Sequence, residues 1–268
     1  MYENHLKEKM KEGPVYGIAI YSGSPAMVEV AGNFGLDFAF IDAEHTGFEV
    51  GSLKECILAA RCSGISPLVR VTRPDEIQIR KALELGAEGV IIPHVRNRQD
   101  AELCVRGARF PQEGQPLWRR GYDSNVRSAA YSSGDFKGTD YIRHSNETEL
   151  VIPMAEDYEF MDNIEEILSV PGLDAINFGP TDYAMSLCIQ KFYDMNEPQV
   201  KKALDTLAQH TTSRQLGLMA PANPPTADGI RSLVERGVNM VILGNDMGFV
   251  NASLKNLMSQ IEEVNRNR

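Results

Sequence analysis

The chain has 268 residues, of which 43% are hydrophobic and 24% are charged, and this composition is typical of an ordinary globular protein with a large apolar core. Its net charge of −10 argues against a nucleic-acid partner, because phosphate binding needs a basic face and no cluster of lysine or arginine stands out. The charge does not exclude an anionic substrate, because one buried arginine or metal ion is enough to bind a carboxylate.

The N-terminus and the cysteines indicate a cytoplasmic protein. The first residues, MYENHLKEKMKEGP, are too polar for a secretory signal. No apolar run approaches the roughly 20 residues of a membrane span. The cysteines form no CxxC pair and are interpreted as reduced, inert thiols; they are Cys56, Cys62, Cys104 and Cys188.

Short apolar runs rich in Val, Ile and Phe recur along the chain, each followed by a turn and a segment with helical periodicity. The eight runs are Val15–Tyr21, Phe38–Glu44, Pro67–Val71, Gly89–Val95, Leu150–Glu156, Ala175–Pro180, Leu216–Ala220 and Asn239–Asp246. Nearly continuous apolar runs are typical of strands buried on both faces of a parallel sheet. The pattern predicts an α/β protein with one domain, a (β/α)8 or TIM barrel over residues 1–268.

Turn residues mark the ends of the predicted helices. One helix begins at Pro74-Asp75-Glu76 and ends at Gly86, as expected for an acidic first turn and a terminal glycine. A second is predicted from Asp157 to about Val170, and a third between Pro225 and Gly237.

The stretch from Phe110 to Thr148 shows no clear strand–helix unit. A connection this long in a compact domain is commonly functional or disordered. Because the chemistry of a barrel sits on loops that follow strands, we expect this stretch to be a lid or a loop that contacts the substrate.

Two acids follow neighbouring predicted strands, and the active site of a (β/α)8 barrel lies at such strand ends. Glu156 ends one run and Asp182 follows the next, so their carboxylates are expected to share one cation. Two carboxylates leave positions for water and a bidentate substrate, which suits Mg²⁺, Mn²⁺ or Co²⁺. The alternative is that each acid only caps the helix after it.

Arg70 and His45 are the other candidates for chemistry. Arg70 stands inside an apolar run, where it either holds a substrate carboxylate or forms a structural ion pair with Glu44 or Glu84. His45 follows a strand end beside Asp42, and a nearby carboxylate prepares an imidazole to act as a general base. The role of His94, which also follows a strand, stays open between catalysis and structure.

All ten lysines fall outside the eight apolar runs. A Schiff-base aldolase needs a desolvated lysine inside the barrel. Stabilisation of a carbanion would therefore have to come from a metal ion acting as a Lewis acid.

The segment FAFIDAEHTGFE resembles the IDxEH segment of the HpcH/HpaI family, the class II pyruvate-dependent aldolases that include 2,4-dihydroxyhept-2-ene-1,7-dioate aldolase. The similarity continues, in the same order and over most of the chain, through PLVRV, IRKALELGAEGVIIPHV, RRGYDSNVRSAAY and VIPMAEDYEFMDNIEEILSVPGLDAINFGPTDYA. The most specific pieces are IDAEH and the combination of Glu156 with GPTD.

The resemblance implies a role for each catalytic candidate. Glu156 and Asp182 match the metal-binding acids of the family. Arg70 matches the arginine that holds pyruvate and its enolate. His45 matches the histidine proposed as acid and base, and Asp42 matches its carboxylate partner.

The resemblance also implies substrate contacts and an assembly. Glu84 falls where family members carry an acid near the histidine. Gly179, Pro180 and Thr181, followed by Asp182, match the turn whose backbone amides receive the substrate carboxylate. The family forms hexamers with an exchanged C-terminal helix, so a homo-oligomer, trimer or hexamer, is expected.

The function implied is a metal-dependent aldolase that reversibly cleaves a 4-hydroxy-2-oxo acid to pyruvate, or a related 2-oxo acid, and an aldehyde. Met154 stands where many family members carry a glutamine near pyruvate, and the loop with QEGQPLW is longer than usual. Because both departures touch substrate contacts, two alternatives stay open. One is a citrate-synthase-like enzyme that forms carbon–carbon bonds, and the other is a non-catalytic barrel that binds an oxo acid.

Overall fold

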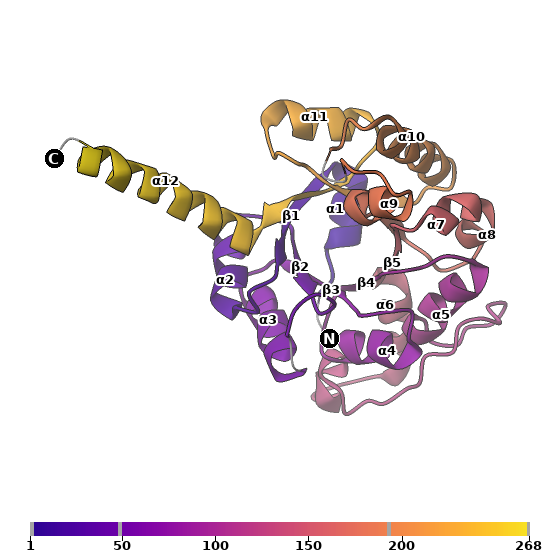
Figure 1. Ribbon diagram of the computed structural model, residues 1–268. Coiled ribbons are helices and arrows are strands. Elements are labelled where there is room, and N and C mark those ends of the chain that lie inside the picture. Colours follow the sequence, from indigo (N-terminus) through magenta and orange to yellow (C-terminus); the bar gives the residue numbers. More distant parts are fainter. Residues whose placement is uncertain (1–2, 48–49, 192–193, 267–268) are drawn as a thin grey trace.

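The structure is a computed structural model that describes residues 3–47, 50–191 and 194–266. Eight parallel strands form a closed barrel in sequence order, with helices on its outside (Figure 1). The strands are β1 (Val15–Ile20), β2 (Phe38–Asp42), β3 (Ser66–Arg70), β4 (Gly89–Ile92), β5 (Leu150–Ala155), β6 (Ala175–Phe178), β7 (Gly217–Pro221) and β8 (Met240–Asn245). Each predicted apolar run overlaps one of them, so the single-domain (β/α)8 barrel is confirmed.

Helices follow the strands and cover the barrel. They are α1 (Leu6–Glu12), α2 (Pro25–Asn33), α3 (Val50–Cys62), α4 (Glu76–Glu84), α5 (Arg98–Ala108), the 3-10 helix η1 (Arg127–Ser132), α6 (Gly138–Thr148), α7 (Tyr158–Asp162), α8 (Ile164–Leu168), α9 (Pro180–Ser186), α10 (Pro198–Ser213), α11 (Ala227–Glu235) and α12 (Asp246–Arg266). Within the described ranges, no helix is both long and apolar enough to cross a membrane.

Side chains of successive strand residues point alternately into the barrel and toward the helices. Along β6, Ala175 belongs to the apolar cluster inside the barrel, whereas Ile176 and Phe178 belong to the cluster between barrel and helices. Leu6 of α1 also joins the inner cluster, and its backbone amide donates to Glu88, which stands just before β4. The amino end of the barrel is therefore closed by apolar packing, and the carboxyl end is left for polar residues.

The predicted helix ends at Asp75, Gly86 and Gly237 are confirmed. The prediction of one continuous helix from Asp157 to Val170 is wrong, because two short helices occupy this segment. The Asp75 side chain accepts hydrogen bonds from the first-turn amides of α4, and both glycines have positive φ. The helical conformation is interrupted at Asn163, between α7 and α8. The Asn163 side chain donates instead to the carbonyl of Arg96, which lies in the loop after β4.

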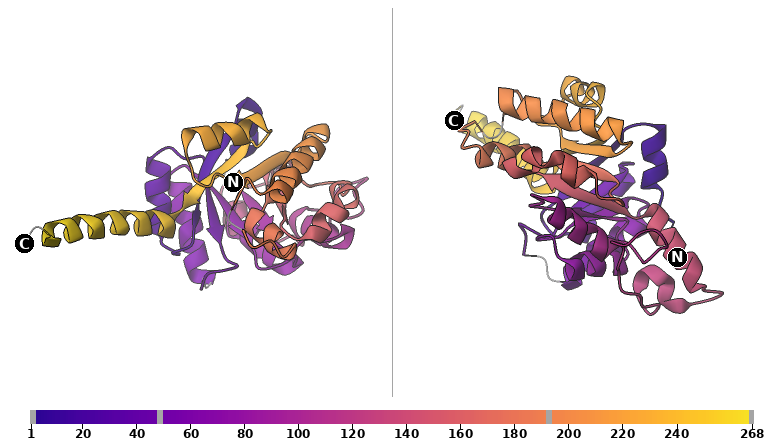
Figure 2. Two further views of the ribbon diagram at one scale, coloured as in Figure 1. Left: turned by 45° about the horizontal axis from the view of Figure 1, so that its top comes forward. Right: turned by 90° about the vertical axis from the view of Figure 1, so that its right-hand side faces the viewer.

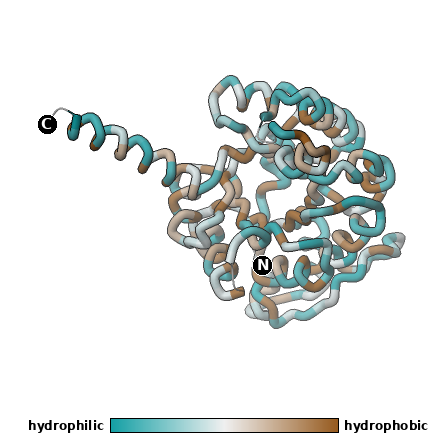
Figure 3. Tube along the Cα trace, in the orientation of Figure 1, coloured by the Kyte–Doolittle hydropathy of each residue, from teal (hydrophilic) through white to brown (hydrophobic). Residues whose placement is uncertain are grey.

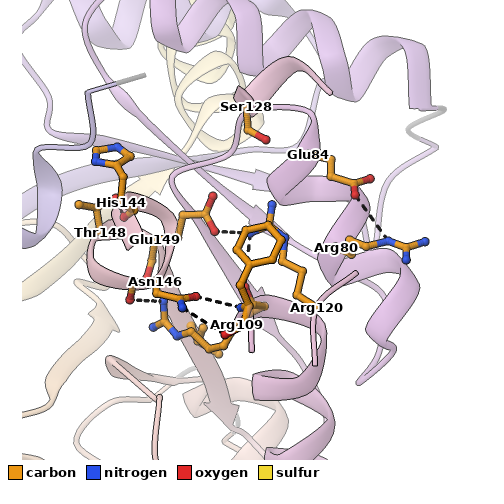
Figure 4. Close-up of polar contacts among 12 residues, drawn as sticks. Arg80, Glu84, Arg109, Arg120, Ser128, His144, Asn146, Thr148 and Glu149 are labelled. Atoms are coloured by element: carbon orange, nitrogen blue, oxygen red, sulfur yellow. Dashed lines mark hydrogen bonds and ion pairs between the residues drawn. The ribbon is translucent and has the colours of Figure 1, made fainter. Parts of the chain in front are cut away.

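The stretch from 110 to 148 does not cover the carboxyl end of its own barrel. It follows a helix rather than a strand, and so it lies toward the amino ends of the strands. Arg120 from this stretch pairs with Glu149 just before β5 and also contacts Tyr141 of α6 (Figure 4). The expectation of a lid over the chain's own site is therefore wrong, because a buried polar network holds this segment at the opposite end.

Helix α12 projects away from the barrel, as the views in Figures 1 and 2 agree. Apolar and polar residues interchange along it (Figure 3). Eight of its apolar side chains are between 42% and 56% exposed, namely Met247, Phe249, Val250, Leu254, Leu257, Met258, Ile261 and Val264. Most recur at spacings of three and four, which places them along one face of the helix.

Candidate active site

A cavity of about 550 Å³ lies at the carboxyl end of the barrel, a size typical of small-molecule sites. Its inner part is lined by residues of six strands, namely Ala19, Phe40, Arg70, Met154, Asn177 and Ile242. Tyr21, His45 and the turn from Gly179 to Asp182 line the part nearer the mouth. The cavity therefore brings together three regions that the sequence selected as candidates for chemistry, namely Arg70, His45 and the turn from Gly179 to Asp182. It also contains Met154, which the sequence selected as a substrate contact.

Arg70 is held rigidly by two acids from β2 and the turn after it. Its Nε and Nη2 atoms donate to the two carboxylate oxygens of Asp42 at 2.8 and 2.7 Å, and its Nη1 lies 3.0 Å from Glu44 Oε2. Burial alone lowers the pKa of the Arg70 guanidinium, but the hydrogen bonds and charge of Asp42 raise it more. Arg70 is therefore a fixed positive charge on the cavity wall. The ion pair with Glu44, which the sequence left open as an alternative, is present, but Asp42 is the main partner.

The carboxylate beside His45 is Glu44 rather than Asp42. Both oxygens of Asp42 bind Arg70, and Oδ1 also accepts the Glu44 amide at 3.0 Å. The His45 Nε2 atom lies 3.6 Å from Glu44 Oε2, and the His45 side chain is 58% exposed. The expected Asp42–His45 pair is thus replaced by a Glu44–His45 pair at the cavity mouth.

Glu84 lies away from this cavity. It stands at the end of α4, a helix that runs back toward the amino ends of the strands, and its Oε1 is 3.7 Å from Arg80 Nε (Figure 4). The expectation that Glu84 lies near His45 is therefore wrong. Because α4 runs back toward the amino ends of the strands, its last residue lies at the opposite end of the barrel.

His94 bridges three acids that follow β2 and β5. Its Nε2 is 3.2 Å from Glu44 Oε1, its Nδ1 is 3.1 Å from Asp157 Oδ2, and its backbone amide donates to Glu156 Oε1 at 2.8 Å. Burial lowers the pKa of the imidazole, but the charges of Glu156, Asp157 and Glu44 outweigh burial and raise it. The structure thus gives His94 a place as a link between three acids, whose charges favour the protonated imidazole.

Glu156, which follows β5, is almost completely buried, with 1% of its surface exposed. Burial, helped by the charges of Glu44 and Asp182, outweighs the hydrogen bond and charge of His94 and raises the pKa of Glu156 to about 7. A Cβ atom on Gly179 would lie 3.0 Å from Glu156 Oε2 and 2.8 Å from its Cβ. Glycine at 179 therefore leaves the space in which the carboxylate lies.

Glu156 and Asp182 fit a divalent cation of the Mg²⁺ class. They supply carboxylate oxygens only, and such hard oxygen ligands with water in the remaining positions suit Mg²⁺ or Mn²⁺. Among the described residues, no group of three or more His, Cys, Asp or Glu side chains is arranged to enclose a metal ion. A closed zinc centre is thus not indicated in this part of the chain.

The turn after β6 offers fewer backbone donors than expected. The Gly179 amide already donates to the carbonyl of Ala155 at 3.1 Å, and Pro180 has no N–H. The expected use of the Gly179 amide for a substrate carboxylate is therefore wrong. The amides of Thr181 and Asp182 remain as candidates in this turn.

The cavity also contains polar residues that the sequence analysis did not select as functional, among them Tyr21, Asn177 and Asn245. Tyr21 ends the first apolar run, and burial raises its pKa even though Arg70 donates a hydrogen bond to it. Asn177 is a polar residue at an inward-facing position of the run AINFG, and Asn245 ends the run MVILGN. The available signal was a polar residue inside an apolar strand, the same signal that identified Arg70.

A family model described as HpcH/HpaI aldolase/citrate lyase matches residues 16–252. The chain therefore belongs to the HpcH/HpaI aldolase/citrate lyase family. It is 28% identical over 251 residues to 2-dehydro-3,6-dideoxy-6-sulfogluconate aldolase of Pseudomonas putida, with 93% of each protein covered. It is 28% identical over 236 residues to 5-keto-4-deoxy-D-glucarate aldolase of Escherichia coli strain K12, with 87% of each covered.

The structure is also similar to that of a citrate synthase, SbnG. The two are 29% identical with a TM-score of 0.83, and the match covers 97% of this chain and 98% of the other. Members of the family thus include carbon–carbon lyases of the aldolase type and an enzyme named for citrate synthesis.

Replacing Asp42 by Asn is expected to lower the free energy of unfolding by about 3 kcal/mol or more, because the buried Arg70 charge loses its main partner. Chemical denaturation measures this change. Replacing Asp140, which forms a surface pair with Arg143, is the matched control and should have little effect. If Asp42→Asn is as stable as the wild type, the pair does not stabilise the fold.

Replacing Glu156 by Gln should stabilise the metal-free protein at alkaline pH. The pKa of Glu156 is about 7 in the fold against an ordinary value of 4.5, so the protonated form favours folding and this contribution is lost as pH rises through 7. The variant, which is neutral throughout, should exceed the wild type by up to about 3 kcal/mol above pH 7. Denaturation midpoints in a chelator measure the difference, and the curves should converge near pH 4.5. Parallel curves would contradict the assigned pKa.

Proposed function

We propose that this protein is a divalent-metal-dependent aldolase that reversibly cleaves a 4-hydroxy-2-oxo acid to pyruvate, or a related 2-oxo acid, and an aldehyde. The observation that carries the proposal is that one cavity is lined by Asp182, by a rigid Arg70 and, at its mouth, by His45. The buried Glu156 carboxylate packs against Gly179 of the cavity wall and is close enough to Asp182 for their charges to interact. The two curated relatives, which are both named as aldolases, support it. A cytoplasmic location stays the prediction made from the sequence.

In this proposal Glu156 and Asp182 hold Mg²⁺, Mn²⁺ or Co²⁺. The bound cation supplies Lewis-acid stabilisation of the negative charge that develops on the substrate. None of the described residues that line the cavity is a lysine, which agrees with a route that uses no Schiff base.

Arg70 stabilises the enolate oxygen that forms when the carbon–carbon bond breaks. Its orientation is set in advance by Asp42 and Glu44, so little reorganisation is needed as the charge develops. The amides of Thr181 and Asp182, which line the same cavity, receive the substrate carboxylate.

His45 acts as the general base in the cleavage direction. It takes the proton of the 4-hydroxyl, the C3–C4 bond breaks, and the electron pair of that bond passes into the enolate of the 2-oxo acid. The aldehyde leaves by the mouth, where His45 is more than half exposed. A proton delivered to C3 then completes the 2-oxo acid product.

The direct test is release of pyruvate from 4-hydroxy-2-oxo acids with Mg²⁺, Mn²⁺ or Co²⁺ and in a chelator. Activity should need the metal and should be lost in Glu156→Gln. His45→Ala should lower kcat for cleavage by about 10²–10⁴-fold, the usual effect of removing a positioned base. Oxaloacetate decarboxylation has no 4-hydroxyl to deprotonate, and so it should survive better in His45→Ala.

The control for this test is Glu84→Gln, which changes an acid that lies away from the cavity and should keep wild-type rates. Wild-type cleavage by His45→Ala would exclude His45 as the base. Undiminished cleavage in the chelator would exclude the metal.

The similarity to the citrate synthase SbnG supports a second candidate, a synthase that joins an acetyl unit to an oxo acid. Such an enzyme would consume acetyl-CoA together with oxaloacetate and would release no pyruvate from 4-hydroxy-2-oxo acids. A barrel that binds an oxo acid without turnover in any of these assays would be the non-catalytic alternative.

We also propose that the protein is a homo-oligomer, a trimer or a hexamer, in which α12 packs on a neighbouring subunit. The apolar face of α12 is exposed in the single chain. A second exposed apolar surface lies at the end of α2, where Val30 is 47% exposed and Phe34, just after the helix, is 84% exposed. An apolar helix face of this length is normally buried against a partner.

Replacing Leu254 and Ile261 of α12 together by Glu should dissociate the oligomer, because charges then stand on the apolar face. Analytical ultracentrifugation of the wild type and the variant measures the change. Ser259→Glu, on the polar face of the same helix, is the matched control and should leave the assembly intact. A wild type that sediments as a monomer would overturn the proposal.

A further inference from the structure

Asn177 places an amide inside the barrel, at the inner end of the cavity. It follows Ala175 by two residues on β6, so its side chain points to the same inner face as the apolar interior. In the strand register it stands opposite Met154 of β5 and Met219 of β7. The amide is thus flanked by two methionines and lines the cavity.

The carbonyl oxygen of this amide has no hydrogen-bond partner among the described residues. Asn177 is 2% exposed, and its Oδ1 atom is buried without a bond. A buried polar atom that is left without a hydrogen bond destabilises the fold. A leucine of similar shape would pack better between the methionines, so the amide has no evident structural purpose at this position.

The position of Asn177 limits what it can bind. It lies two residues before Gly179, against which the Glu156 carboxylate packs, and so it is one inward-facing position deeper than the proposed metal ligands. In the proposed function, the carboxylate and 2-oxo oxygens of the substrate are matched by the cation, by Arg70 and by the turn after β6. The amide is left for a further group on the part of the substrate that stays in the barrel.

We propose that Asn177 recognises a hydroxyl group on the third carbon of the 2-oxo acid, so that the site prefers a 3-hydroxy-2-oxo acid to pyruvate. The inference rests on the proposed function. A hydroxyl both donates and accepts, so it matches the free Oδ1 and the neighbouring NH₂ of an amide. A carboxylate at that carbon would only accept, and a methyl group would leave the amide unpaired.

The test compares the binding of hydroxypyruvate and pyruvate, without an aldehyde, to the wild type and to Asn177→Leu. Calorimetry in Mn²⁺ gives each dissociation constant. The wild type should bind hydroxypyruvate more tightly, and the variant should lose about tenfold to a hundredfold in this preference. The variant's thermal midpoint should be equal to or above that of the wild type, because the unpaired amide is gone.

Asn223→Leu, at an exposed position on the cavity rim, is the matched control and should leave the preference unchanged. Equal weakening of both acids in Asn177→Leu would overturn the hydroxyl assignment, because the amide would then bind a part that both acids share. A large fall in the thermal midpoint would show that Asn177 is structural and would also overturn it.

The two proposals fail in different ways. If the wild type binds neither acid, the proposed function fails and takes this inference with it. If the wild type binds both acids and Asn177→Leu keeps the wild-type preference, only this inference fails.

Discussion

Balance of buried charge is the constraint on which this site depends. Acidic and basic side chains alternate in a row across the ends of β2 to β5, namely Asp42, Arg70, Glu44, His94 and Glu156. Successive side chains approach each other to 2.7, 3.0, 3.2 and 3.6 Å. Buried ions are tolerated only when they are paired. The row ends on Glu156, whose next neighbour in charge is another acid, Asp182. Negative charge is therefore in excess at that end, where burial raises the pKa of Glu156, and the divalent cation of the proposed function would complete the balance.

The same row explains why positions with no charge of their own matter. Gly179 has no side chain, and only this lets the Glu156 carboxylate lie against the turn after β6. The backbone of His94 has a positive φ of 55°, which directs its amide to Glu156 and its ring toward Glu44. Backbone geometry at β4 and β6 thus sets the position of an acid carried by β5.

The strands were predictable because each is a nearly continuous apolar run. Arg70, Glu156 and Asp182 could be selected because each is a charged residue inside, at the end of or just after such a run, and the role of the two acids as metal ligands stays a proposal. The ion-pair partners of these residues were not predictable, because they depend on the register between neighbouring strands. Asp42 pairs with Arg70 since β2 and β3 align them side by side, whereas His45 stands beyond the strand. Glu84 and the stretch from 110 to 148 were misplaced for one reason, since helix ends and segments that follow helices lie opposite the catalytic end. Residues 48 and 49, which end the IDAEHTGFE segment, lie outside the described residues.

Assembly and the cavity meet at the junction of β8 and α12. Gly244 and Asn245 line the cavity, and the next residue, Asp246, begins α12. The Asp246 carboxylate accepts the amides of Tyr21 and Ser22 at 2.9 and 3.1 Å, so the first turn of α12 is tied to the end of β1, and Tyr21 in turn contacts Arg70. A subunit that buried the rest of α12 against a neighbour would restrict the motion of this junction. Ordering of the cavity wall and formation of the proposed oligomer would then be linked equilibria, each favouring the other.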